Sequence, residues 1–293
     1  MKIALCFSGP LRQFKEGYEC LEHHVLNYWK KNNIKYDIFF HTWDNHIQYF
    51  KFQSDGGEFK EAISLYKPTD YKLEIYDDKK KENLLFDSKF NLYLKYLSQN
   101  GFDWEQHLGG KCFTSGGIMR DNHIAMFYGM KKVNEIRKEY EKRNKIKYDI
   151  VIRNRFDNII FDKIDLDVLN MAMNDKKNVY IPIGYDPDDK DILCAVNDQF
   201  ALGSPRAMDI HMNLYDKLYD YLIKRYNDNF PQPSYALGLT KYNLVENNIG
   251  IKRFYLDYII HKYYEKYDKA GGVVTGYKWD VLIEKKDGVY EDD

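Results

Sequence analysis

The stretch "YDIVIRNRFDNIIF", residues 148–161, opens with an apolar run and continues into two arginines and an aspartate. A short continuous apolar run is typical of a strand that is buried on both faces of a sheet. Arg153, Arg155 and Asp157 follow at its carboxyl end. Open α/β sheets bind their ligands at that end of the strands. The three side chains therefore either form an internal ion pair or hold an anionic ligand.

Apolar runs of similar length recur along the chain, with segments of helical spacing between them. This alternation predicts an α/β fold with a mostly parallel, doubly wound central sheet flanked by helices. The polar segment 77–115 interrupts the alternation, and we interpret it as a helical insertion. The other predicted strands are residues 2–7, 36–42, 71–76, 178–183, 198–203 and 249–256, and the predicted helices are residues 14–32, 117–144, 204–226 and 233–248.

Composition and charge narrow the class of protein. The chain has 44 basic and 45 acidic side chains, so its net charge of −1 provides no global field for binding nucleic acid. No stretch approaches the roughly 20 apolar residues of a membrane span, and the first apolar run is too short for a signal peptide. The four cysteines form no CxxC pair, which favours free thiols in a reducing compartment. We expect one domain over residues 1–293, in the cytoplasm or peripherally at the cytoplasmic face of a membrane.

The first predicted strand ends in "FSGPLRQF", residues 7–14. Backbone amides in the turn at Ser8 and Gly9, followed by the guanidinium of Arg12, suit a phosphate group. The alternative is an ordinary tight turn with a surface arginine. The stretch matches neither GxGxxG nor GxxxxGK[ST], so it carries no dinucleotide or P-loop fingerprint.

The segment after the strand at 148–153 carries unbalanced charge. In an extended chain, alternation would place Arg153, Arg155 and Asp157 on one side. One structural salt bridge needs only one arginine, and burying the second cation without a partner is costly. A bound pyrophosphate, together with a divalent cation on Asp157, would balance the cluster. We therefore favour a ligand over an internal ion pair.

Two further polar residues are candidates for the same edge of the sheet. Asp198 begins an apolar run and can act as a general base toward a hydroxyl or bind an acceptor sugar; otherwise it is an N-cap or turn residue. His41, at the end of the strand predicted over 36–42, is either a metal ligand or base, or a hydrogen-bonded structural residue.

Taken in order, these segments resemble a GT-A-type glycosyltransferase, and most closely the WavE-like group of lipopolysaccharide and capsular polysaccharide transferases, which has relatives in large DNA viruses. The resemblance covers about residues 2–255, and it is carried by the ordered set of motifs. The motifs are "ALCFSGPLRQF", "YDIFFHTWD", "FYGMKKVNEI" followed by "YDIVIRNRFD", "NDQFALGSPRAMD" and "PSYALGLTKYNLVENNIGIKR".

The resemblance implies a nucleotide-sugar donor, with UDP or GDP, and a glycan acceptor. The donor half would be residues 1–160 and the acceptor half residues 161–260, with a C-terminal extension over 261–293. The resemblance places Mn²⁺ or Mg²⁺ on Asp157, in the "RFD" segment that corresponds to DxD. Since Arg155 replaces the first aspartate there, the alternative is that the arginines neutralise the diphosphate themselves.

The resemblance also implies that Asp198 is the base on the acceptor side of an inverting reaction. Two rival functions remain open. A sugar nucleotidyltransferase would share the doubly wound sheet, but it normally has a glycine-rich loop after the first strand. A non-catalytic protein that binds glycans or nucleotides through a degenerate transferase fold would explain the incomplete acidic motif.

Overall fold

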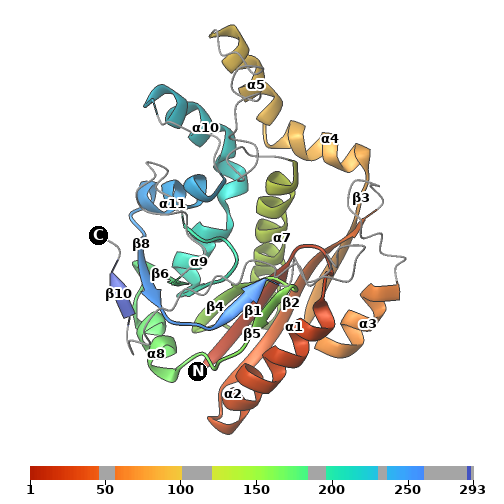
Figure 1. Cartoon of the computed structure of the whole chain (residues 1–293), viewed down its shortest axis with the longest axis vertical. Helices are drawn as coiled ribbons and strands as arrows, with labels where there is room; N and C mark the ends of the chain where they lie inside the picture. The colour runs from red at the N-terminus through yellow and green to blue at the C-terminus, as the bar shows by residue number, and fades with distance from the viewer. Residues whose placement is uncertain (46–56, 101–120, 184–195, 230–235, 261–288, 292–293) are drawn as a thin grey trace, which may run out of the picture.

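The computed structural model describes residues 1–45, 57–100, 121–183, 196–229, 236–260 and 289–291. Within them, a central sheet of eight strands runs through the molecule (Figure 1). Its strands are β1 (Lys2–Ser8), β2 (Lys35–Asn45), β3 (Asp70–Tyr76), β4 (Ile150–Asn154), β6 (Asn178–Pro182), β7 (Ala201–Gly203), β8 (Gly250–Phe254) and β10 (Val289–Glu291). They are arranged in the order β10-β8-β6-β7-β4-β1-β2-β3.

Most neighbouring strands are parallel, as the sequence predicts. β1 pairs in parallel with β2 and β4, β2 with β3, and β6 with β8. The exceptions are β7, which is antiparallel to both β4 and β6, and β10, which is antiparallel to β8. A separate antiparallel pair joins β5 (Asn158–Ile160) to β9 (Tyr258–Ile260).

Helices cover both faces of the sheet (Figure 1). One face packs against α1 (Phe14–Cys20), the π-helical turn η1 (Leu21–Leu26), α2 (Asn27–Lys31), α3 (Gly57–Tyr66) and α8 (Leu166–Asn174). The other face packs against α7 (Asp121–Asn144), α9 (Pro205–Met212) and α11 (Ala236–Glu246), and beyond them lie α4 (Asp78–Asp87), α5 (Phe90–Gln99), η3 (Leu214–Lys217) and α10 (Leu218–Asn227). None of the described helices is long and apolar enough to cross a membrane.

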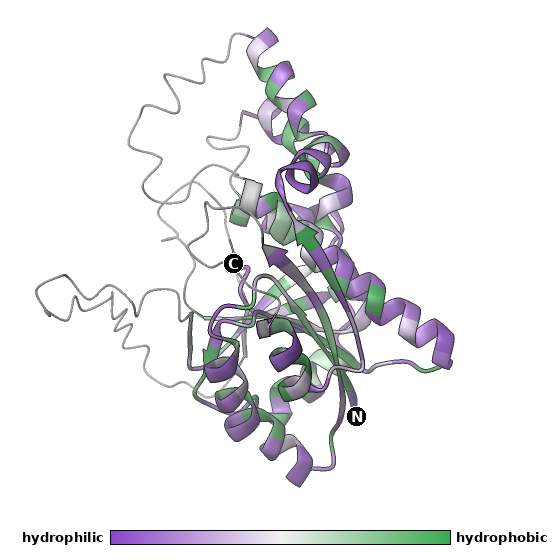
Figure 2. Cartoon of the chain, turned by 90° about the vertical axis from the view of Figure 1, so that its right-hand side faces the viewer, coloured by the Kyte–Doolittle hydropathy of each residue, from purple (hydrophilic) through white to green (hydrophobic). Residues whose placement is uncertain are grey.

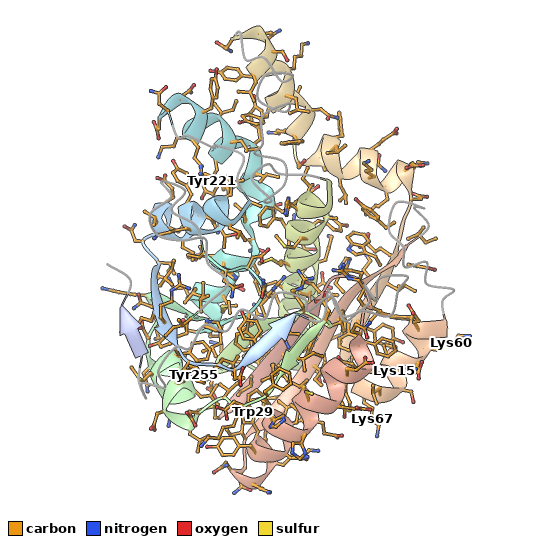
Figure 3. The ribbon with its side chains drawn as sticks, viewed as in Figure 1. Lys15, Trp29, Lys60, Lys67, Tyr221 and Tyr255 are labelled. Carbon is orange, nitrogen blue, oxygen red and sulfur yellow. The ribbon has the colours of Figure 1, made fainter. Side chains whose placement is uncertain are left out.

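The period-2 alternation of the strands divides the core into two clusters. On β1, Leu5 and Phe7 face α1 and α2, whereas Ala4 and Cys6 face α7. Trp29 of α2 is fully buried in the first cluster, and in Figure 3 it lies on the inner side of its helix. Figure 2 shows hydrophobic and hydrophilic residues alternating along the helices, as expected of helices with one face against a sheet.

Several sequence predictions are confirmed and others need correction. The seven predicted strands are all present, and residues 14–31 form one continuous helical stretch. The helix predicted over 204–226 is wrong as a single element, since it divides into α9, η3 and α10. The insertion over 77–115 contains α4 and α5, and the remainder of that segment lies outside the described residues. The short strands β5, β9 and β10 were not predicted.

The chain changes from one face of the sheet to the other between β1 and β4. The helices that follow β1 and β2 lie on one face, whereas α7, which leads into β4, lies on the opposite face. Such a change is a topological switch point, and open α/β sheets bind ligands outside the carboxyl ends of the strands at that point. The loop after β1 and the turn after β4 therefore meet where a ligand is expected.

Candidate functional site

The candidate site lies at the carboxyl edge of β1 and β4, where the sequence places its charged residues. Ser8 is the last residue of β1, and Arg12 follows in the next loop. Arg153 lies near the end of β4, and the turn after β4 carries Arg155 and Asp157. The predicted donor-binding and metal-binding residues therefore come from two neighbouring strands at one edge.

The chain after β4 makes a turn, so the expectation of an extended chain through Asp157 is wrong. β4 ends at Asn154, and residues 156–157 form the turn that leads into β5. Phe156 fixes the turn, because its ring is buried against Phe7 at 5.4 Å and against Phe40 at 4.8 Å between ring centroids. Anchoring this aromatic side chain holds the two flanking charged residues at the edge of the sheet.

Asp157 is paired with two arginines. Arg155 Nε donates to Asp157 Oδ1 at 2.7 Å, and Arg155 Nη2 donates to Oδ2 at 2.8 Å. Arg12 Nη2 lies 3.2 Å from the same Oδ2. The Asp157 side chain is 3% exposed, whereas those of Arg155 and Arg12 are 14% and 17% exposed. The side chains of Arg155 and Arg12 are thus somewhat more exposed than the carboxylate that they share.

The loop after β1 is held by backbone contacts. Gly9 has a φ of 123°, which side chains other than hydrogen disfavour, and its N–H donates to the His41 carbonyl at 3.3 Å. The Thr42 hydroxyl donates to the Gly9 carbonyl at 2.8 Å. The Gly9 amide that the sequence assigned to phosphate binding is therefore used within the protein. In this loop the guanidinium of Arg12 remains as the group suited to an anion.

Helix α1 packs unusually close to the turn after β4. A Cβ atom at Gly17 would lie 2.2 Å from the carbonyl oxygen of Phe156, so only glycine fits at this position. This close approach brings the loop that carries Arg12 against the turn that carries Asp157. Sequence reasoning missed Gly17, since nothing in its helical pattern distinguishes it from an ordinary helix glycine.

Arg153 differs from the other two arginines. It is 1% exposed, and its Nε and Nη1 atoms have no hydrogen-bond partner among the described residues. Burial lowers its pKa to about 10, an effect that Asp198 partly offsets and Arg155 reinforces. It therefore remains protonated at neutral pH as a buried cation that is short of hydrogen-bond acceptors. Such a group is costly unless it binds something.

Asp198 reaches the same edge because β7 runs antiparallel to β4. The register pairs Ala201, the first residue of β7, with Arg153 near the end of β4. The residues just before β7 are therefore at the carboxyl edge of β4. Asp198 is buried to 9% exposure, and its charge acts on both Arg153 and Arg155.

A set of amide side chains holds the segment around Asp198. Asn158 Nδ2 donates to Asn154 Oδ1 at 2.6 Å and to the Gln199 carbonyl at 3.1 Å. Gln199 N donates to Asn197 Oδ1 at 2.8 Å, and Asn197 in turn donates to the Tyr258 hydroxyl. These bonds connect the turn after β4 to the segment on either side of Asp198, which fixes the carboxylate relative to the arginines.

His211 of α9 is a further buried residue of this region that sequence reasoning missed. It is fully buried, and neither ring nitrogen has a hydrogen-bond partner among the described residues. Burial, with a contribution from Arg153, lowers its pKa to about 3 against the opposing effect of Asp198. Its spacing from the buried Ala207 is four residues, a helical signal that would have placed it on the inner face of α9.

Ser8 and His41 face α7 on the other side of the loop. A Cβ atom added at Gly129 of α7 would lie 3.6 Å from Ser8 Cβ and 3.3 Å from His41 Nδ1. Both side chains therefore pack closely against α7. His41 Nε2 lies 3.5 Å from Glu74 Oε1, and burial lowers the pKa of the imidazole. Glu74 also pairs with Lys80, at 2.6 Å. His41 is therefore a buried imidazole beside a paired carboxylate, and neither of its ring nitrogens has a hydrogen-bond partner among the described residues.

The donor set around Asp157 does not fit Mn²⁺ or Mg²⁺. Both carboxylate oxygens of Asp157 are paired with guanidinium groups, and the cations of Arg12 and Arg155 lie where a metal would have to bind. Within the described part of the chain, no group of three or more His, Cys, Asp or Glu side chains could hold a metal ion. A divalent cation on Asp157 would have to displace at least one arginine.

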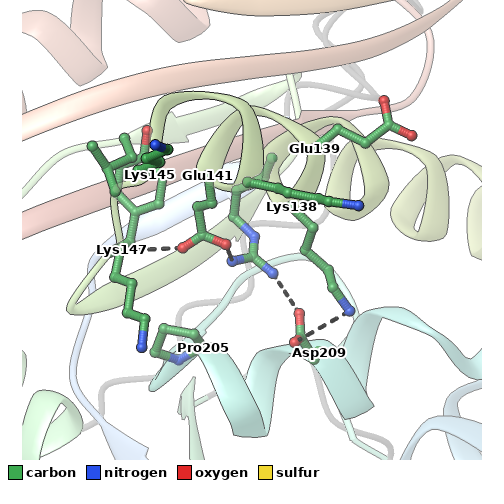
Figure 4. A pocket seen from close by; sticks show the side chains of 11 residues that line it. Lys138, Glu139, Glu141, Lys145, Lys147, Pro205 and Asp209 are labelled. Carbon is green, nitrogen blue, oxygen red and sulfur yellow. Dashed lines mark hydrogen bonds and ion pairs between the residues drawn. The ribbon is translucent and has the colours of Figure 1, made fainter.

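A groove of about 720 Å³ lies at the opposite edge of the sheet, between the C-terminal half of α7 and the start of α9 (Figure 4). Its buried cation, Arg137, is fully paired. Arg137 donates from Nε to Asn134 at 3.1 Å, from Nη1 to Glu141 at 2.6 Å and from Nη2 to Asp209. Arg137 therefore provides an internal comparison for Arg153: both are buried arginines, but two nitrogens of Arg153 have no acceptor among the described residues.

Comparison with known proteins assigns no family to the chain. No protein-family model matches the sequence, and no curated protein matches it. The resemblance to GT-A-type transferases stays a prediction that rests on the ordered motifs. The function is therefore inferred from the geometry and charge of the site.

Proposed function

We propose that the chain is a glycosyltransferase that moves a sugar from a UDP- or GDP-sugar to a hydroxyl of a glycan acceptor, in polysaccharide or glycoprotein glycan synthesis. Arg12, Arg153 and Arg155 bind the diphosphate, and Asp198 serves the acceptor. The scattered cysteines favour a reducing compartment, so we place the reaction in the cytoplasm or at the cytoplasmic face of a membrane.

One observation carries the proposal: Arg153 is buried at the switch point of the sheet, and two of its guanidinium nitrogens have no hydrogen-bond partner among the described residues. A purely structural arginine would have acceptors, as Arg137 has. A diphosphate supplies several anionic acceptors at once, and guanidinium groups match their geometry. Arg12 and Arg155 are partly exposed at the carboxyl ends of the same two strands, and they add two cations to this part of the protein.

The charges of the site match the reaction. The acceptor oxygen attacks the anomeric carbon, the bond from that carbon to the diphosphate oxygen breaks, and its electron pair stays on the diphosphate. Fixed guanidiniums stabilise the negative charge that develops there. The Asp198 carboxylate receives the proton of the acceptor hydroxyl as the new bond forms. A single base on the acceptor side corresponds to inversion at the anomeric carbon.

A donor panel tests the proposal. UDP- and GDP-sugars would be incubated with the protein, and release of UDP or GDP would be measured with and without oligosaccharide acceptors. We expect one donor to be turned over, faster when an acceptor is present. Nucleotide binding without turnover of any donor would favour the non-catalytic binding protein. Formation of a nucleotide-sugar from a sugar phosphate and a nucleoside triphosphate would favour the nucleotidyltransferase.

A further inference from the structure

We infer, on the basis of the proposed function, that the diphosphate binds without a divalent cation and that Asp157 is the internal counter-ion of Arg12 and Arg155. The sequence placed a metal on Asp157, so this inference assigns the residue a different role. The arginines take the part that a metal ion would otherwise have.

The first support is the geometry of the carboxylate. Arg155 forms a bidentate pair with Asp157, at 2.7 and 2.8 Å, and Arg12 approaches the second oxygen at 3.2 Å. Mg²⁺ requires close, near-octahedral oxygen ligands and is usually held by one or two carboxylates together with substrate phosphates. Asp157 cannot provide such an oxygen without losing a charge-assisted hydrogen bond to an arginine.

The second support is electrostatic. Burial disfavours the charged guanidinium of Arg155, but the pair with Asp157 raises the pKa of Arg155 above its usual value. The two cations lie within hydrogen-bonding distance of the carboxylate, so they would repel a divalent cation placed there. The carboxylate therefore serves to hold the guanidiniums in place and charged.

The third support is the charge available to a ligand. Arg12, Arg153 and Arg155 carry three positive charges against the two negative charges of Asp157 and Asp198, so the cluster has a net charge of +1. A nucleotide-sugar carries two negative charges on its diphosphate, so this net positive charge favours its binding in the absence of a metal. Arg153 contributes most directly, since two of its nitrogens have no acceptor among the described residues.

Calorimetric titration with UDP and GDP tests the inference on the unmodified protein. One series would contain EDTA, and matched series would contain MgCl₂ or MnCl₂. We expect the tighter of the two nucleotides to bind in EDTA with a dissociation constant within about threefold of its value with metal. Binding that appears only with metal, or is at least tenfold tighter with it, would overturn the inference and leave the proposed function intact. Failure of both nucleotides to bind in every series would overturn both.

A variant separates the two roles of Asp157. In Asp157→Asn the arginines lose their counter-ion, so affinity for the nucleotide in EDTA should stay unchanged or rise by up to about tenfold. In the series with MgCl₂ or MnCl₂, loss of affinity by tenfold or more in a variant with an unchanged circular dichroism spectrum would contradict the counter-ion role, since a lost metal ligand has that effect when metal is present. Asp165→Asn is the matched control, because Asp165 forms an exposed ion pair with Lys163 at 3.1 Å.

Discussion

Gly17 of α1 lies directly against the backbone of Phe156, and a Cβ atom at position 17 would stand 2.2 Å from the Phe156 carbonyl oxygen. This contact joins the helix after β1 to the turn after β4. It is the reason that Arg12, from one of these segments, can pair with Asp157, from the other, at 3.2 Å. The cationic site thus depends on a close approach of two backbones.

Gly17→Ala should therefore destabilise the protein and weaken the site. Overpacking of this kind costs about 1–3 kcal/mol of the free energy of unfolding, which urea denaturation would measure. Nucleotide affinity should fall as well, because α1 has to move away from the turn. Glu16→Ala, on the exposed side of the same helix, is the control and should stay within about 0.5 kcal/mol of the wild type. Equal stabilities of the Gly17 and Glu16 variants would contradict the packing argument.

Arg153→Met should make the folded protein more stable. Burial lowers the pKa of Arg153 to about 10, so the charged form is disfavoured in the folded state and its removal lowers that cost. A gain of about 1–3 kcal/mol in the free energy of unfolding is expected. Arg137→Met should have the opposite effect, because it leaves Glu141 and Asp209 without their buried partner. Two destabilised variants would indicate that Arg153 is a structural arginine like Arg137.

His211 predicts a pH dependence of stability. Its pKa is about 3 in the folded protein and about 6.5 in the unfolded chain, so between these values the unfolded chain binds the extra proton. The free energy of unfolding should fall as the pH drops below about 6.5, by up to ~1.4 kcal/mol per pH unit for this one group. His41, with a lowered pKa, adds to the slope.

His211→Phe isolates the contribution of His211. The pKa of Glu74 lies below its usual value, so the stabilisation from its ionised form is lost only at a pH below the usual pKa of a glutamate. Between pH 6.5 and 5, the slope of stability against pH therefore reports on the histidines. Urea denaturation across that window should give a slope lower by about one bound proton in the variant. Identical slopes in the two proteins would show that His211 is not held neutral.

Most of the sheet could be predicted from sequence, because strands buried on both faces are continuous apolar runs. The charged positions were found because they follow such runs. The pairing of Asp157 with Arg12 could not be predicted, since it depends on the turn at 156–157 and on the close approach at Gly17. The division of 204–226 into three elements was also missed, because apolar spacing continues across the break at Asn213.

Asp198→Asn should separate catalysis from donor binding. An amide cannot accept the acceptor proton, and a general base is worth about 10²–10⁴ in rate. We expect a loss of that size in the turnover number for transfer, with the affinity for UDP or GDP within about threefold of the wild type. Asp209→Asn is the comparison variant, because Asp209 lines the groove beside Arg137. It would show whether loss of any partly buried aspartate lowers the turnover number to the same extent. Full activity of Asp198→Asn would exclude Asp198 as the base.

The affinity of the Arg153→Met variant for UDP and GDP tests the central claim most directly, since the variant is expected to fold at least as well as the wild type. Calorimetric titration in EDTA should show binding weakened by at least tenfold relative to the wild type. Arg143→Gln is the matched control, because Arg143 at the C-terminal end of α7 is exposed and pairs with Asp70, the first residue of β3, at 2.7 Å. The affinity of this variant should be unchanged. Wild-type affinity in Arg153→Met would contradict the claim that the buried guanidinium binds the diphosphate.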